Sequence, residues 1–172
     1  MNLKIYLSAN DFDKAIADIK KYREELADKL VVLVDKLCRN GVEVAKIKVL
    51  ASQGDSSETS VVYDPPNANG DIVSATIYLE GKDAIFVEFG AGIYYNNGNN
   101  HPKAAEFGFG IGTYPSKHPP NRAINPGYWW YGNREVGKHL SIGTEATMPL
   151  FNASETIRNN LIKTAIEEFM RG

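Results

Sequence analysis

Apolar residues near the N-terminus recur at the spacing of one helical face. The repeat begins after Asn10 or Asp11, either of which can cap a helix with its side-chain oxygen. Its members are Phe12, Ile16, Ile19, Tyr22, Leu26, Leu30, Leu33 and Leu37. Charged residues occupy the opposite face, which is typical of an amphipathic helix. Asn40-Gly41 favours a helix stop, so the pattern predicts a helix of about 28 residues, roughly 42 Å long.

The next part of the chain, residues 42–89, predicts one short element and then a set of strands. Residues 42–50 mix two periods, so a second, short helix and a strand are both possible, and the helix is favoured. Residues 59–63 are rich in β-formers and are predicted to end at Asp64-Pro65-Pro66, because proline cannot donate to a ladder. Residues 71–79 alternate between apolar and polar, which indicates a half-buried strand. The continuous apolar run 84–89 is predicted to be its antiparallel partner.

The segment 90–146 has a different composition. It is rich in glycine and proline, yet it holds five tyrosines and both tryptophans of the chain. Long loops of this kind are functional or disordered, and binding surfaces, unlike disordered linkers, are enriched in aromatic residues. We therefore expect an arm or large loop that becomes fully ordered against a partner.

A last helical repeat closes the chain. Thr147 is a candidate cap, and Pro149 is tolerated in a first turn. The apolar stripe consists of Leu150, Ala153, Ile157, Leu161, Ala165 and Phe169. It predicts a second helix of roughly 36 Å that continues to about Arg171.

Composition narrows the class of protein. The chain has 172 residues, 19 Lys and Arg and 21 Asp and Glu, for a net charge of −2, so we expect one domain over residues 1–172. This near-neutral balance argues against an electrostatic grip on nucleic acid, which needs a basic face. The single cysteine, Cys38, excludes an internal disulfide and favours a reducing compartment. No apolar run reaches roughly 18 residues, and no signal-peptide pattern is present, which predicts a soluble cytosolic product with no membrane partner.

Three kinds of chemistry find little support. The potential metal ligands are Cys38, His101, His118 and His139. Their spacing matches no zinc motif, so no metal is predicted. The glycine-rich run 108–112 lacks the Gly-Lys-Ser/Thr ending and the helix of a phosphate loop, so no cofactor is predicted. Ser116 and His118 have no orienting acid nearby, and no catalytic residue is predicted.

Glu88 is unusual because it lies within the apolar run 85–92. A buried carboxylate must be hydrogen-bonded or charge-paired. One interpretation is a catalytic acid. The favoured interpretation is a loop anchor, in which Glu88 accepts backbone N–H bonds from the adjoining glycine loop that contains Gly90 and Gly92. The arm would then leave the sheet at a defined place.

Four consecutive aromatic residues stand out within the arm. They are Tyr128, Trp129, Trp130 and Tyr131. They could stack on single-stranded nucleic acid, although only Arg122 and Arg134 flank them. They could also form a protein–protein hot spot, or a satellite core that packs the loop on its own domain. As functional residues they are candidates for partner binding.

Two short motifs resemble a known family. Phe86–Gly92 matches the pattern (Phe/Tyr)-(Val/Ile)-Glu-Phe-Gly-(Thr/Ala)-Gly, and Pro149–Ala153 matches Pro-(Phe/Leu)-x-x-Ala. With the order of the predicted elements, these motifs resemble the tail-completion or head–tail joining proteins of tailed bacteriophages, relatives of the lambdoid-phage gene-product-ten family that are often carried in prophages. The order of elements agrees over most of the chain, and the motifs cover about a dozen residues.

The resemblance implies an α+β fold, in which a small, mainly antiparallel sheet packs against a long N-terminal helix and a C-terminal helix, with the long glycine- and aromatic-rich loop added. It also implies a non-enzymatic virion protein without cofactor. Such a protein is a ring subunit at the head–tail junction whose partners are copies of itself and the neck, adaptor and tail-tube proteins. It is made in the bacterial cytoplasm before assembly. The alternatives are a small hydrolase using Glu88 or His118, and a single-stranded nucleic-acid-binding module using Tyr128–Tyr131.

Overall fold

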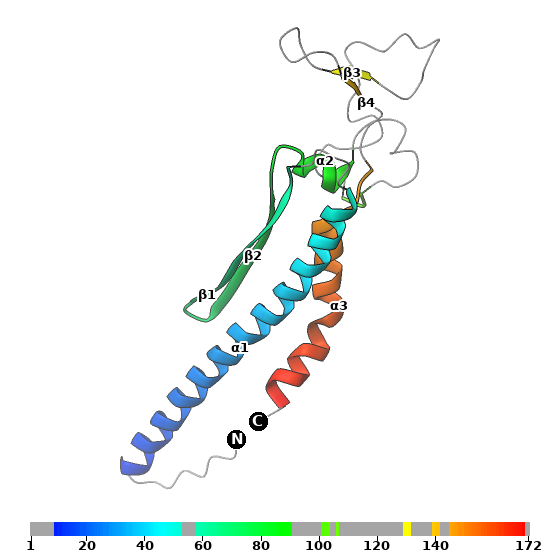
Figure 1. Cartoon of the computed structure of the whole chain (residues 1–172). Helices are drawn as coiled ribbons and strands as arrows, with labels where there is room; N and C mark the ends of the chain where they lie inside the picture. Colours follow the sequence, from blue (N-terminus) through cyan, green and yellow to red (C-terminus); the bar gives the residue numbers. More distant parts are fainter. Residues whose placement is uncertain are drawn as a thin grey trace.

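Two helices and a hairpin make up the main body of the chain. The computed structural model describes residues 9–52, 58–90, 101–103, 106, 129–131, 139–141 and 145–170. The elements are α1 (Ala9–Ser52), β1 (Ser60–Asn69), β2 (Ile72–Glu80), α2 (Ala84–Phe89), β3 (Trp129–Tyr131), β4 (His139–Ser141) and α3 (Pro149–Met170). Both α3 and the β1–β2 hairpin pack on α1 (Figure 1). The fold is therefore α+β, with a long N-terminal helix, a two-stranded antiparallel sheet and a C-terminal helix, as the resemblance implied.

Helix α1 continues through Asn40-Gly41, so the predicted stop there is wrong. The helix has 44 residues, and the predicted short helix at 42–50 is its last part. Gly41 is buried, and a Cβ atom on it would lie 2.9 Å from Ile157 Cδ1 of α3 and 3.2 Å from Ile77 Cδ1 of β2. The glycine thus lets two elements approach α1 closely, and it serves packing instead of ending the helix.

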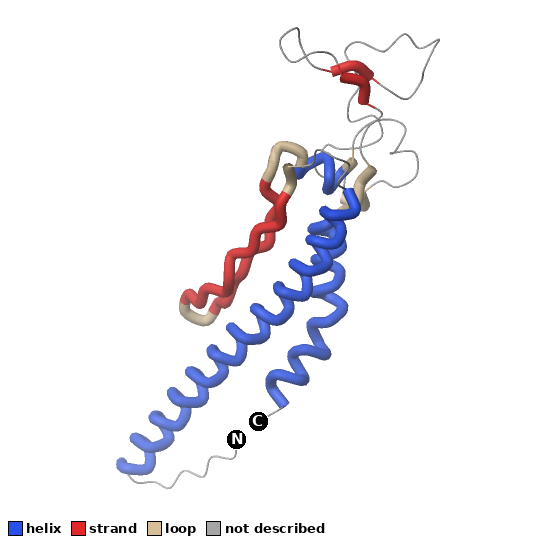
Figure 2. Tube along the Cα trace, in the orientation of Figure 1, coloured by secondary structure: helices blue, strands red, loops and turns tan. Residues whose placement is uncertain are grey.

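The apolar stripe of α1 is covered along only part of its length. Leu33 and Leu37 are buried, whereas Phe12, Ile16 and Ile19 are each about half exposed. The tube in Figure 2 shows why: the first turns of α1 extend past the hairpin and past the end of α3. The core therefore lies along the second half of α1.

The sheet is a hairpin with its tip at Gly70-Asp71. Its register runs from Ser60 opposite Glu80 to Asn69 opposite Ile72. The predicted alternation of residues 71–79 is confirmed by the burial pattern of β2. The predicted end of the first strand at Asp64-Pro65-Pro66 is wrong, because the register shifts between Asp64 and Asn67. This bulge lets the ladder pass the two prolines, which have no N–H to donate.

Residues 84–89 form helix α2, so the predicted strand and its pairing with residues 71–79 are wrong. The N–H of Val87 donates to Asp83 O at 2.9 Å, and the N–H of Gly90 donates to Phe86 O at 2.7 Å. Successive side chains of a strand point to opposite faces. The helical turn instead buries Val87 and its neighbour Glu88 together, and both contact the start of α3.

The predicted arm at 90–146 lies mostly outside the described residues. Within it, β3 pairs antiparallel with β4, with Trp129 opposite Ser141 and Tyr131 opposite His139.

A polar cluster joins β1 to α1. The Tyr63 hydroxyl donates to Asp35 Oδ1 at 2.8 Å, and Arg39 Nε donates to Asp35 Oδ2 at 2.6 Å. The Arg39 guanidinium also lies 5.8 Å from the centre of the Tyr63 ring. The hydrogen bond from Arg39 lowers the pKa of Asp35, and Tyr63 adds to this effect. Partial burial and the bond to Asp35 raise the pKa of Tyr63 to about 12.

We expect Gly41→Leu to lower the free energy of unfolding by about 2 kcal/mol, because the new side chain must displace Ile157 and Ile77. Urea denaturation measures the change. Asn40→Leu is the matched control, since Asn40 precedes Gly41 in α1 and is exposed; it should leave stability unchanged or slightly higher. Equal stability of the two variants would contradict the packing role of Gly41.

Alkaline pH should weaken the fold through Tyr63. Its pKa rises from 10.0 to about 12 on folding, so the folded state holds the phenol proton more tightly than the unfolded state does. The stabilisation is complete below pH 10 and is lost as the pH rises toward 12. Tyr63→Phe should remove this part of the pH dependence in urea titrations at several alkaline pH values. Tyr78→Phe, on β2, should keep the wild-type slope.

Candidate functional site

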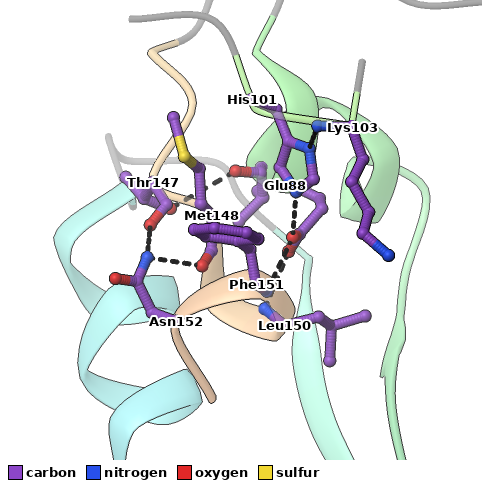
Figure 3. Close-up of polar contacts among 9 residues, drawn as sticks. Glu88, His101, Lys103, Thr147, Met148, Leu150, Phe151 and Asn152 are labelled. Carbon is purple, nitrogen blue, oxygen red and sulfur yellow. Dashed lines mark hydrogen bonds and ion pairs between the residues drawn. The ribbon is translucent and has the colours of Figure 1, made fainter. Parts of the chain in front are cut away.

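The two motifs, which lie far apart in the chain, meet at the carboxylate of Glu88, 62 residues before Leu150. Glu88 Oε2 accepts a hydrogen bond from the N–H of Leu150 at 2.8 Å, and Oε1 accepts one from the N–H of Phe151 at 2.9 Å. Figure 3 shows the side chain reaching from α2 to the first turn of α3. Glu88 therefore caps a helix that lies far away in the sequence.

Every backbone N–H of that first turn has an acceptor. Pro149 has no N–H, Leu150 and Phe151 donate to Glu88, and the N–H of Asn152 donates to Met148 O at 3.0 Å. Free N–H groups at a helix start otherwise need water or a local cap. The negative charge of Glu88 also lies at the positive end of the α3 dipole. Together these terms stabilise an ionised carboxylate in a buried position.

Thr147 does not act as the predicted N-terminal cap of α3. Its hydroxyl donates instead to the carbonyl oxygen of Val87 at 3.3 Å. The same carbonyl accepts the N–H of Thr147 at 3.1 Å and that of Met148 at 3.4 Å. Backbone bonds to Val87 and side-chain bonds to Glu88 thus tie the entry of α3 to two consecutive residues of α2.

These bonds hold a strained turn. Met148 has a φ of +54°, in the left-handed region that side-chain-bearing residues rarely adopt. Such a conformation costs of order 1–3 kcal/mol and persists where surrounding contacts impose it. Asn152 adds to them, because its Nδ2 donates to Met148 O at 2.7 Å.

His101 completes the joint around Glu88. Its Nε2 lies 3.0 Å from Glu88 Oε1, and its Nδ1 accepts the N–H of Lys103 at 3.0 Å. Because Nδ1 is an acceptor, this network assigns the proton to Nε2 and makes the ring neutral. The ring contacts Phe89 and Phe151, with centroid distances of 4.5 Å and 5.2 Å.

The polar atoms at this joint are bonded within the chain. The side chains of Glu88 and His101 are 7% and 4% exposed. The carboxylate takes three N–H donors, and both ring nitrogens of His101 are used within the chain. A groove between α1 and the tip of the hairpin lies away from Glu88. Its lining includes Leu26, Leu30 and Val73.

Of the other predicted site residues, the structure describes Gly90 in full and only the backbone of Trp129, Trp130 and Tyr131. Gly90 ends α2 with a φ of +73°, a conformation suited to glycine. Gly92, His118 and Tyr128 lie outside the described residues, as do the side chains of Trp129, Trp130 and Tyr131 in β3. Among described residues, the donors to Glu88 come from α3 and His101, not from the glycine loop.

Cys38 and the acidic and histidine residues form no metal site in the described part of the chain. No three His, Cys, Asp or Glu side chains gather there. Burial raises the pKa of the Cys38 thiol in α1, which disfavours the reactive thiolate. Within the same residues, no helix combines the length and apolar character needed to cross a membrane.

Sequence reasoning missed His101 and the donors in α3. A signal for the donors was present: Met148, which cannot cap through its side chain, stands directly before Pro149 at the first helical position. A buried helix start of this kind needs an acceptor from elsewhere. His101 has no comparable signal, because its approach to Glu88 depends on the path of the intervening loop.

Comparisons of this chain with models of protein families, with curated proteins and with solved structures found no match.

Glu88→Gln should lower the free energy of unfolding by about 2 kcal/mol, because one acceptor oxygen becomes an NH₂ group that faces an N–H donor. Glu88→Ala should cost more, since it leaves the donors unpaired. Urea denaturation compares both variants with Glu167→Gln, a control at an exposed position of α3. Stability unchanged by Glu88→Gln would contradict the capping role.

Proposed function

We propose that this chain is a non-enzymatic structural protein of a phage or prophage virion, a ring subunit at the head–tail junction. One observation carries the proposal: the two motifs on which the family resemblance rests are joined by the bonds of Glu88 to Leu150 and Phe151. If two distant motifs form a single contact, one physical reason accounts for both of them. Here the reason is a helix cap.

The joint also defines the base of the arm. The arm leaves α2 after Gly90 and returns before Thr147, and the carbonyl of Val87 binds the N–H groups of Thr147 and Met148. Both ends of the arm are therefore bonded to α2. A segment with such a base can present Tyr128–Tyr131 to a neighbouring molecule while the helices stay unchanged.

The proposed partners follow from this role. They are further copies of the chain in a ring, the neck or adaptor proteins, and the tail-tube protein. A ring requires head-to-tail contacts between unlike surfaces, and a net charge of −2 permits self-association without strong repulsion. The proposal places the protein in the virion, after synthesis in the host cytoplasm, with no cofactor and no specific nucleic acid or membrane partner.

Inactivation of the gene in the phage or prophage genome tests the proposal. We expect electron micrographs of lysates to contain filled heads and separate tails, with few joined particles. The wild-type gene on a plasmid should restore joined particles, whereas Trp129→Ala/Trp130→Ala should not. Tyr78→Ala, which removes an exposed aromatic side chain from β2, is the matched control and should restore them.

Joined, infectious particles in normal numbers from the inactivated genome would contradict the proposal. Purified protein bound to one end of isolated tails would support it independently.

A further inference from the structure

The first turns of α1 carry a bare apolar face. Phe12, Ile16, Ile19 and Tyr22 are 48%, 50%, 55% and 51% exposed, and Leu26 is 37% exposed. Ala15, a small residue between them, is buried. This face belongs to the same apolar stripe of α1. Farther along the helix, the side chains of that stripe pack against α3 and the hairpin.

The apolar area of the bare face is large enough for a weak protein–protein interface. Half-exposed side chains of this size together present roughly 450 Å² of apolar surface. The largest patch on a typical monomer is of this order and is often functional. Two such faces in contact bury roughly 900 Å² before their polar edges are counted, which is the size of a weak, concentration-dependent interface.

The order of the apolar residues is symmetric about Ile19. The steps from Phe12 through Ile16, Ile19 and Tyr22 to Leu26 are four, three, three and four residues. If two copies of the helix cross antiparallel at Ile19, Phe12 faces Leu26 and Ile16 faces Tyr22. A two-fold interface needs such self-complementarity, because the same surface serves both subunits.

The charges favour the same direction. Residues 11–18 contain three Asp and one Lys, whereas residues 20–23 contain Lys20, Lys21 and Arg23 and no acid. In the antiparallel arrangement about Ile19, Asp18 of one copy lies beside Lys20 of the other and Lys14 lies beside Glu24, each pair twice. Asp13 lies beside Glu25, so opposite charges outnumber like charges in this contact. Parallel pairing in register would place acid beside acid, which is unfavourable.

The hairpin tip sets the limit of the contact. Arg23 Nη2 lies 2.5 Å from Asp71 Oδ1 and holds the tip on α1. A groove lined by Leu26, Leu30 and Val73 opens between the tip and the helix. In the antiparallel arrangement, Phe12 of the second copy arrives at Leu26, at the mouth of this groove, which can receive its ring.

We propose that two copies of this chain associate through antiparallel pairing of α1 residues 12–26 about a two-fold axis at Ile19. The contact closes at two copies. It does not rest on the proposed ring function, which needs unlike surfaces, and it describes the free protein. The dimer covers apolar side chains of α1 that are about half exposed in the single chain.

Sedimentation over a range of concentrations tests the dimer. The full-length protein should change from monomer to dimer as concentration rises. Ile19→Glu should raise the dissociation constant by more than about tenfold, because it places a charge at the centre of the contact. Ile162→Glu is the matched control: Ile162 is 74% exposed on α3, and its variant should dimerise normally. A wild-type protein that stays monomeric, or a dimer unaffected by Ile19→Glu, would overturn the proposal.

Cross-linking tests the direction of pairing in a Cys38→Ser background. With a short bis-maleimide, Ile19→Cys should give a covalent dimer. Phe12→Cys alone should not, because its two copies lie about 21 Å apart along the helices. An equal mixture of Phe12→Cys and Leu26→Cys should cross-link. Cross-linking of Phe12→Cys alone would indicate parallel pairing and overturn the proposal. The particle-joining assay is separate, so either proposal can fail alone.

Discussion

The structure depends on one buried carboxylate at the start of a helix. Glu88 offers two oxygens to N–H groups of α3 and one of these oxygens also to His101. Pro149 has no N–H to donate, and Met148 cannot cap the helix with its side chain. Glu88 therefore accepts the free N–H groups, and its negative charge lies at the positive end of the helix dipole. This contact fixes the start of α3 beside α2, and packing on α1 accounts for the rest of its course.

The packing of α1 explains the rest of the arrangement. Over its second half, Gly41 allows α3 and β2 to approach, and Leu33 and Leu37 are buried. Over its first half, the same kind of face is bare. A single helix thus takes part in the core of its own chain and, in the dimer that we propose, contacts a second copy. Hydrophobic burial would favour the second contact for the same reason that it favours the packing of α3 and the hairpin on α1.

The joint and the bare helix face lie in different parts of the molecule and serve different roles. The joint gathers both ends of the arm at α2, which suits a segment that meets neighbours in an assembly. The bare face belongs to a projecting helix, which suits contact with a second copy. A ring needs unlike surfaces and a two-fold dimer needs like ones, so the chain can use the two regions for separate associations.

The sequence by itself determined the elements whose signals are local. The periodicity of α1 and α3, the alternation in β2 and the position of Pro149 at a helix start depend on neighbours in the chain. The tertiary structure decided what depends on distant partners. Residues 84–89 have the composition of a strand but are helical, because Val87 and Glu88 must reach α3 together. Gly41 resembles a stop signal but fits the approach of Ile157 and Ile77. Glu88 was predicted to be an anchor, yet its donors in α3 and at His101 could not be predicted from the sequence. A buried carboxylate requires hydrogen-bond partners, but the sequence does not say which residues supply them.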